Sequence, residues 1–265
     1  MKKIFLSIIL TVVLISCSKV PISGRRQVNL LPESTLMGMS LSSYRDFLSK
    51  SIVVPATDAQ TQMVKRVGQN IAKAVETYMK QKKLSKRIKN FKWEFNLVND
   101  KTVNAWCMPG GKVAVYTGLL PVTMDETGLA VVMGHEIAHA IARHGNERMS
   151  QQLIVTLGAI GVAVAIAEKP KETQDIFLSS YGIGSTLGIL KYSRTHESEA
   201  DKLGLVFMAM AGYNPQEAVG FWERMATQSG GPKVPELVST HPSDATRIKD
   251  IKAFLPKAMK YYKPR

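Results

Sequence analysis

The sequence is poor in cysteine and lacks a long apolar segment. Cys17 and Cys107 are the two cysteines among its 265 residues. The longest apolar runs, residues 4–15 and 153–167, are shorter than the roughly 20 residues that a membrane-spanning helix requires. A scaffold stapled by disulfides is therefore excluded. The second run is expected to form a buried core helix or a membrane-dipping hairpin, and Cys107 to pack as a small buried hydrophobe.

Acidic residues are also scarce. The chain has 21 Asp and Glu against 35 Lys and Arg, which gives a formal net charge of +14. Part of the excess lies in "KQKKLSKRIK", residues 80–89, which is predicted to be a solvated helix end and loop. The alternative is a surface that docks on anionic lipid headgroups. No nucleic-acid-binding motif accompanies the charge, so a nucleic-acid partner is not expected.

The N-terminus has the features of an export signal. Lys2 and Lys3 precede the apolar run 4–15, which ends in Ser16 and Cys17. A basic start, a short apolar run, a small residue and a cysteine together resemble a bacterial lipobox. We expect lipidation of Cys17, which would anchor the protein to a membrane without a spanning helix. The alternatives are an uncleaved anchor and a generic signal peptide.

The chain is expected to divide into four parts. The segment after Cys17 combines Pro, Gly and basic residues, as is typical of a tether. Ser18 and Lys19 do not include the aspartate that retains some lipoproteins in the inner membrane, so an outer-membrane protein facing the periplasm is favoured. The expected parts are a lipoprotein signal peptide at 1–16, a lipidated tether at 17–32, a folded domain at 33–256 and a basic tail at 257–265.

Hydrophobic periodicity predicts a mostly helical α+β fold. Residues 33–50 and 57–81 have apolar positions near helical spacing, and Asp58 or Thr57 could cap the second helix. From Asp125 onward the remaining segments are again helical in pattern. Between these regions the period changes to that of strands.

The strands are expected to form a small, mostly antiparallel sheet. Residues 92–98 alternate between apolar and polar side chains. Two further strand-like runs flank Pro109-Gly110-Gly111, which is a turn signal.

The segment "HEIAH" carries the first part of a metal site. His135 and His139 are four residues apart, so on a helix both imidazoles can reach one ion. Glu136 lies beside that face, where its carboxylate can act as general base toward a water activated by zinc. The apolar residues around the motif predict a buried helix.

A catalytic zinc needs a third protein ligand and an open position. His144 follows His139 too closely for the known histidine spacing, and it is expected at a helix end or behind a ligand. The better candidate is Glu197, which precedes Asp201 by one helical turn, so that Asp201 can hold a ligating histidine. Glu199 is the rival ligand, although it points away from the face of Glu197.

The remaining histidines are His196 and His241. His196 is expected at the surface or behind a ligand. His241 precedes Arg247 in "THPSDATR", and this pair could stabilise the oxyanion of a tetrahedral intermediate. The alternative is that His241 and the following proline cap a helix.

These motifs together resemble peptidase family M48, in particular its branch of bacterial lipoproteins. The resemblance rests on "HEIAH", "ESEAD" and "THPSDATR", with support from "PISGRRQVNLLPES" and "NAWCMPGGKVAVYTGLL", and it covers about residues 20–255. It implies a gluzincin-type metallopeptidase domain whose small antiparallel sheet packs on the H-E-x-x-H helix. It implies one zinc ion per chain and a polypeptide substrate.

The resemblance also implies roles for individual residues. The zinc ligands would be His135, His139 and Glu197, and the catalytic residues would be Glu136, His241 and Arg247. Asp201 would support the site. In some members the histidine at the position of His241 is thought to hold the enzyme latent. The substrate would lie as an added strand along residues 103–108, with Asn104 near its backbone.

The chain departs from other members of the family in two ways. The interval between the two halves of the site holds residues 153–167 and 175–190 where membrane-embedded members have spanning helices, and no C-terminal helical-repeat domain is expected. The expected function is a membrane-tethered zinc endopeptidase that acts on cell-envelope proteins in quality control. The alternatives are a latent, chaperone-like factor that binds unfolded β-strands and a lipoprotein with a structural zinc.

Overall fold

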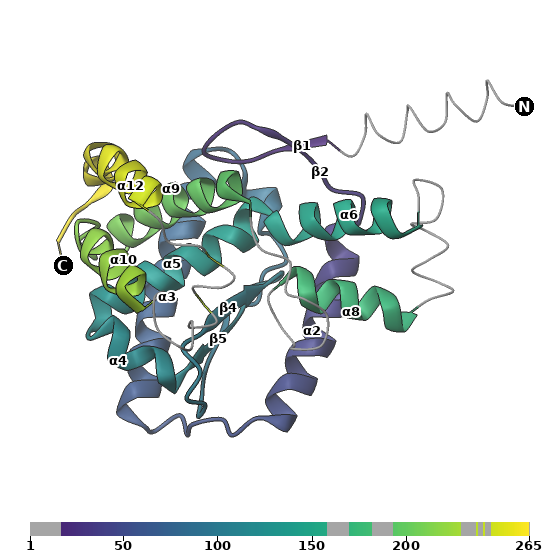
Figure 1. Ribbon diagram of the computed structural model, residues 1–265, viewed down its shortest axis with the longest axis horizontal. Coiled ribbons are helices and arrows are strands. Elements are labelled where there is room, and N and C mark those ends of the chain that lie inside the picture. Colours follow the sequence, from purple (N-terminus) through teal and green to yellow (C-terminus); the bar gives the residue numbers. More distant parts are fainter. Residues whose placement is uncertain are drawn as a thin grey trace, which may run out of the picture.

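The computed structural model describes residues 17–157, 170–181, 193–228, 237, 241 and 245–264 (Figure 1). The expected signal peptide, most of the apolar run 153–167 and most of the segment 175–190 lie outside these residues. The α+β class, with mostly helical content, is confirmed. Among the described residues, no helix combines the length and the apolar character that crossing a membrane requires.

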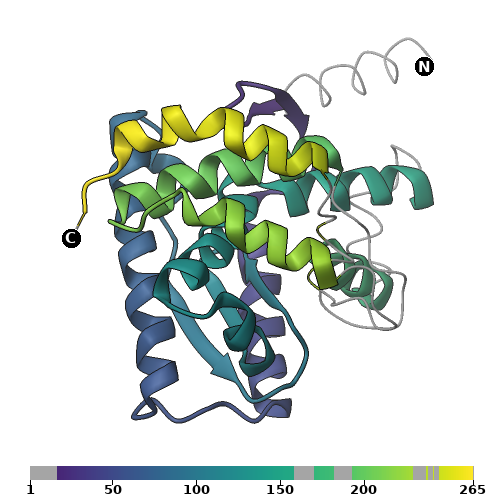
Figure 2. The same cartoon turned by 60° about the vertical axis from the view of Figure 1, so that its left-hand side comes forward.

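Two helices form the centre of the fold. Helix α5 (Glu126–Ala142) packs along α9 (Arg194–Met210), as Figures 1 and 2 show. At their crossing a Cβ on Gly204 would lie 3.0 Å from the backbone of Gly134, so the two glycines allow the helix axes to approach closely. This close packing brings the "HEIAH" and "ESEAD" segments face to face.

A three-stranded sheet lies against α5. Its strands are β3 (Glu94–Val98), β4 (Ala105–Met108) and β5 (Lys112–Tyr116), in the order β3-β5-β4. The predicted turn joins β4 and β5, and both of its glycines have φ of +80°. Cys107 in β4 is buried, as predicted.

The sheet differs from the expectation in one pairing. Strands β4 and β5 are antiparallel, but β3 is parallel to β5. The hairpin of β4 and β5 turns β5 back alongside β3, so that β5 becomes the central strand. β3 therefore has a parallel neighbour. The sheet is mixed, whereas periodicity had indicated a mostly antiparallel one.

The predicted N-terminal helices are present. Helix α2 (Glu33–Lys50) has the expected bounds, and α3 (Ala59–Gln81) begins after Asp58. The carboxylate of Asp58 accepts hydrogen bonds from two backbone N–H groups of the first turn, which identifies Asp58 as the cap rather than Thr57.

The residues before α2 form a short hairpin. Strands β1 (Cys17–Lys19) and β2 (Arg26–Val28) are antiparallel. The amide of Gln27 donates a hydrogen bond to the backbone oxygen of Ala142 at 2.8 Å, so the segment expected to be a tether packs on the end of α5.

Part of the basic segment 80–89 also contacts the end of α5. Arg87 Nε donates to the backbone oxygen of Ile141 at 2.8 Å, and its Nη2 donates to that of Ala142 at 3.2 Å. A cation at a helix C-terminus satisfies carbonyl groups that have no partner in the helix. Arg87 thus has a structural role within a segment that was expected to be solvated.

Two C-terminal helices complete the fold. Helix α12 (Ala245–Ala258) lies beside α9 on the side away from the sheet, and α10 (Glu217–Gln228) contacts α5 and α12 (Figure 2). The shorter elements are η1 (Ser85–Arg87), η2 (Thr117–Leu119), α4 (Leu120–Thr123), α6 (His144–Leu157), α8 (Pro170–Ser180) and η3 (Met259–Tyr261).

Candidate metal centre

Four metal-binding side chains converge at the interface of α5 and α9. His135 and His139 come from α5, Glu197 comes from the first turn of α9, and His241 lies between α10 and α12. One donor atom from each lies within 4.8 Å of the others, and all four residues are buried. Glu199, the rival ligand, is not in this group.

The donor spacing fits a single zinc ion. His135 Nε2 lies 3.0 Å from His139 Nε2 and 3.2 Å from His241 Nδ1, while Glu197 Oε1 lies 3.5 Å from His139 Nε2. Tetrahedral zinc with bonds of 2.0–2.1 Å requires ligand atoms about 3.3 Å apart. Imidazole nitrogens this close also cannot all be hydrogen-bonded to one another, so a cation between them accounts for the arrangement.

Glu197 is suited to ligation because it remains ionised. Burial raises its pKa, but the charges of His241 and Arg247 and hydrogen bonds from the two α5 histidines hold it well below the ordinary value. A carboxylate held in its charged form within a buried site is a good zinc ligand.

Glu136 faces the same site from α5. Within the described part of the chain its Oε1 is buried and has no hydrogen-bond partner, and His241 Nε2 lies 3.5 Å from it. Burial, reinforced by the nearby Glu197 carboxylate, raises the pKa of Glu136 to about 7. A carboxyl group with this pKa can both accept and release a proton near neutral pH.

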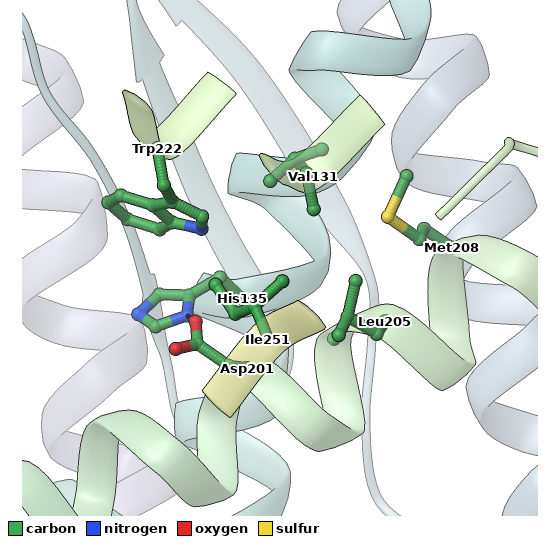
Figure 3. Close-up of a pocket in the computed structure, with 9 residues that line it drawn as sticks. Val131, His135, Asp201, Leu205, Met208, Trp222 and Ile251 are labelled. Atoms are coloured by element: carbon green, nitrogen blue, oxygen red, sulfur yellow. Dashed lines mark hydrogen bonds and ion pairs between the residues drawn. The ribbon is translucent and has the colours of Figure 1, made fainter. Parts of the chain in front are cut away.

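Asp201 lies behind His135, as its spacing from Glu197 suggested. Its Oδ1 is 2.9 Å from His135 Nδ1, so the imidazole can donate from Nδ1 and present the Nε2 lone pair to the site. Figure 3 shows the Asp201 carboxylate beside this ring, with Trp222 on the other side. The centroids of the Trp222 and His135 rings are 5.5 Å apart. No sequence motif had singled out Trp222.

Arg247 in the first turn of α12 holds two carboxylates. Its Nε and Nη2 donate to Asp201 at 2.8 and 2.7 Å, and its Nη1 lies 3.0 Å from Glu197 Oε2. The guanidinium carbon is 3.4 Å from the centroid of the Trp222 ring. These contacts favour a role in orienting the acids over the predicted contact with a substrate oxyanion.

His144 lies behind His139. The chain leaves α5 through Arg143, whose φ of +63° is left-handed, and α6 begins at His144. The Nδ1 atoms of His144 and His139 are 2.9 Å apart, and His144 Nε2 lies 3.0 Å from Glu199 Oε2. His144 is fully buried. Glu199 therefore points away from Glu197, as predicted, but toward a second buried group of charges.

That second group includes a cation from the N-terminal hairpin. Arg25 donates from Nε and Nη2 to Glu199 at 3.0 and 2.9 Å, and from Nη1 and Nη2 to Glu147 at 2.7 and 2.8 Å. His196 Nε2 lies 3.0 Å from Glu147 Oε2. His196 is also buried, which removes the surface position that had been one expectation for it.

Strand β4 lies at one edge of the described sheet, next to α5. Asn104 just before it is buried, and its side-chain oxygen accepts a hydrogen bond from the backbone N–H of Ala105. The backbone oxygen of Val103 accepts a hydrogen bond from Leu237 N–H at 3.2 Å, and Leu237 in turn accepts one from His241 N–H. Leu237, four residues before His241, therefore links His241 to the start of the predicted substrate edge.

The sequence of the chain is similar to those of known metallopeptidases. Residues 59–255 match the profile described as peptidase family M48. The chain is 34% identical over 242 residues to the mitochondrial metalloendopeptidase OMA1 of Schizosaccharomyces pombe, with 90% of this chain and 66% of the relative covered. It is 31% identical over 250 residues to the OMA1 of Homo sapiens, with 91% and 46% covered.

A bacterial relative matches a shorter part of the chain. The chain is 32% identical over 162 residues to the beta-barrel assembly-enhancing protease of Yersinia pestis, with 60% of this chain and 33% of the relative covered. The chain thus spans between about one third and two thirds of the length of these relatives.

Proposed function

Because the chain belongs to peptidase family M48, we propose that it is a zinc-dependent endopeptidase tethered to a membrane of the cell envelope. The observation that carries this proposal is the buried convergence of His135, His139 and Glu197 on one point, with Glu136 beside them. In this assignment the first three residues are the permanent ligands and Glu136 is the general base.

The reaction would use the proton affinity of Glu136. Zinc held by these donors would lower the pKa of a water molecule and polarise the scissile carbonyl. Glu136 Oε1 would take the proton of the attacking water and pass it to the leaving nitrogen of the peptide bond. In the zinc-free chain burial raises the pKa of Glu136, which increases the proton affinity of this carboxylate.

His241 would control access to the site. Its Nδ1 lies 3.0 Å from Glu197 Oε1 and 3.2 Å from His135 Nε2, which places it as a fourth donor. A catalytic zinc keeps one position open. We therefore propose that His241 is a removable latch, which leaves this position when a substrate carbonyl approaches. Arg247 would keep Asp201 and Glu197 in place during this change.

The substrate would be an extended polypeptide. Strand β4 offers an edge to which a further strand could be added, and Asn104 lies at its start. Lipidation of Cys17 would place the protein at a membrane. The similarity to a bacterial beta-barrel assembly-enhancing protease supports a location in a bacterial envelope. Ser18 and Lys19, which do not include the aspartate of inner-membrane retention, favour the outer membrane facing the periplasm. Similarity to the mitochondrial metalloendopeptidase OMA1 supports the endopeptidase activity, and we propose that this activity serves the quality control of envelope proteins.

A pair of variants tests the function. Glu136→Gln should retain zinc and lose cleavage of an unfolded protein such as casein by about 10²–10⁴-fold, because only the proton acceptor is removed. His241→Ala should retain zinc and cleave faster, because the latch is removed. Zinc content and cleavage rate are measured on the same preparations.

Other outcomes would support the alternatives. Wild-type cleavage by Glu136→Gln would remove this residue from the mechanism. Full rescue of a null strain by the same variant would favour the latent, strand-binding function. Loss of zinc from His241→Ala would make His241 a permanent ligand of a structural zinc.

A further inference from the structure

The two histidines of α5 are held from behind in different ways. His135 contacts Asp201, which pairs with Arg247; we call Asp201 and Arg247 the direct support. His139 contacts the imidazole of His144 at its Nδ1. We propose that His144 is a positioning residue for the zinc ligand His139, fixed in one tautomer by Glu199 and Arg25. This inference rests on the proposed function.

The tautomers follow from the direction of each ring nitrogen. His139 Nε2 faces the donor cluster, 3.0 Å from His135 Nε2, so as a ligand it presents a lone pair there and carries its hydrogen on Nδ1. That N–H points at His144 Nδ1, which must therefore accept. His144 then carries its own hydrogen on Nε2, which faces Glu199 Oε2 at 3.0 Å.

Glu199 is placed to act as the final acceptor. Arg25 donates two hydrogen bonds to its carboxylate, and the hydroxyl of Ser23 donates another. A carboxylate that faces a guanidinium stays ionised and can only accept. We call His144, Glu199 and Arg25 the relayed support, because an imidazole separates the ligand from the carboxylate.

The local backbone makes the contact rigid. Arg143 adopts the left-handed conformation between α5 and α6, and it places His144 over His139 although the two are five residues apart. His144 is 0% exposed, and its ring stacks on that of His196, with centroids 4.5 Å apart. Stacking alone does not decide which ring nitrogen faces which neighbour, so the contacts of His144 with His139 and Glu199 set its orientation.

His196 provides a matched control. It is also buried and lies in the same group of charges, and its Nε2 contacts Glu147, whereas His144 contacts the ligand His139. A purely structural role for the group predicts similar effects from both histidines. A positioning role for His144 predicts that zinc affinity depends on His144 and not on His196.

The test measures zinc affinity by chelator competition in the full chain. His144→Gln keeps a polar group near the Nε2 position and removes the acceptor for His139, and the dissociation constant for zinc should rise about tenfold or more. His144→Asn keeps a polar atom near the Nδ1 position and should stay within about threefold of wild type. His196→Gln should lower the thermal midpoint of the zinc-free protein and leave the zinc affinity within the same margin.

A spectroscopic readout separates positioning from general damage. In the cobalt-substituted protein, His144→Gln should change the visible absorption bands of the metal, while His144→Asn and His196→Gln should leave them in place. If both His144 variants fail to fold, Glu199→Gln carries the test with an expected three- to tenfold loss of zinc affinity.

The outcomes are distinct. Wild-type zinc affinity and an unchanged cobalt spectrum in His144→Gln, or equal losses of affinity in His144→Gln and His196→Gln, would overturn the positioning role. If His144→Asn loses as much affinity as His144→Gln, the acceptor at the Nδ1 position is not what matters, and the inference is also overturned. Failure of the wild-type chain itself to bind zinc would instead contradict the proposed function.

Discussion

The direct and the relayed support each contain a carboxylate paired with an arginine, but the two arginines lie at different depths in the fold. Each ends in a guanidinium that pairs with a carboxylate of α9. The side chain of Arg247 in the direct support is 5% exposed, whereas that of Arg25 in the relayed support is 28% exposed. Arg247 belongs to α12, while Arg25 comes from the hairpin next to the proposed lipid anchor. One site is thus held by one cation deep in the fold and another near its surface.

The two arginines should differ in how much they contribute to stability and to metal binding. Removing a deeply buried cation leaves its carboxylates without compensation in a medium of low polarity. Removing a partly exposed cation lets water take over part of its role. The direct support should therefore matter more for folding, while both supports should matter for metal affinity.

The largest effect is expected from the same substitution at the two arginines. Arg247→Gln should lower the free energy of unfolding by about 3–5 kcal/mol, because Asp201 and Glu197 remain buried and charged. Arg25→Gln should cost only about 1 kcal/mol. Urea unfolding of the zinc-free proteins measures both, and equal losses would contradict the difference in depth.

The next effect compares the two carboxylates. Asp201→Asn should weaken zinc binding about 10–100-fold, because Asp201 contacts the ligand His135 directly. Glu199→Gln should weaken it less, since His144 stands between Glu199 and His139. Chelator competition on both variants gives the ratio. A larger loss from Glu199→Gln would reverse the order of the two supports.

The smallest effect concerns acid stability in the relayed support. Burial raises the pKa of Glu199 and of Glu147, but hydrogen bonds from His144, His196 and Arg25 lower each of them from 4.5 to about 2. A depressed carboxyl pKa contributes stability above the unfolded value, and this contribution is lost as the pH falls from about 4.5 through about 2. Burial also lowers the pKa of His144 from 6.5 to about 4. The stability that neutral His144 contributes therefore begins to fall below about pH 6.5, at a higher pH than the contribution of the two carboxylates.

Arg25→Gln isolates this contribution. Its stability deficit relative to wild type should shrink as the pH falls from 5 to 2, because protonated carboxyls no longer need the cation. Thermal unfolding of the zinc-free proteins across this range is the measurement. A deficit that stays constant would show that the arginine stabilises the fold through packing rather than charge.

The two residue pairs of the site that lie one helical turn apart could be predicted from the sequence. His135 and His139 are one turn apart, as are Glu197 and Asp201, so period alone places each pair on a common face. Asp58 as a helix cap is local in the same sense. The convergence of the two pairs was an expectation, and the crossing at Gly134 and Gly204 is what brings it about.

The relayed support could not be predicted in this way. Glu199 was expected to point away from the ligands, which is correct, but a direction on a helix does not say what lies there. Helix α9 is packed on more than one side, so the face of the helix that carries Glu199 is also buried. Its partners His144 and Arg25 are 55 and 174 residues away in the chain, and only the tertiary fold joins them. The parallel pairing of β3 with β5 was missed for the same reason.

In the proposed site, α5 and α9 share one zinc ion whose carboxylate ligand is Glu197 and not Glu199. The most direct test is the zinc content of two matched variants after dialysis against limiting zinc. Glu197→Gln should retain little or no zinc, and Glu199→Gln should retain about one ion per chain, as wild type should. Zinc retained by Glu197→Gln and lost from Glu199→Gln would show that Glu199 is the ligand instead.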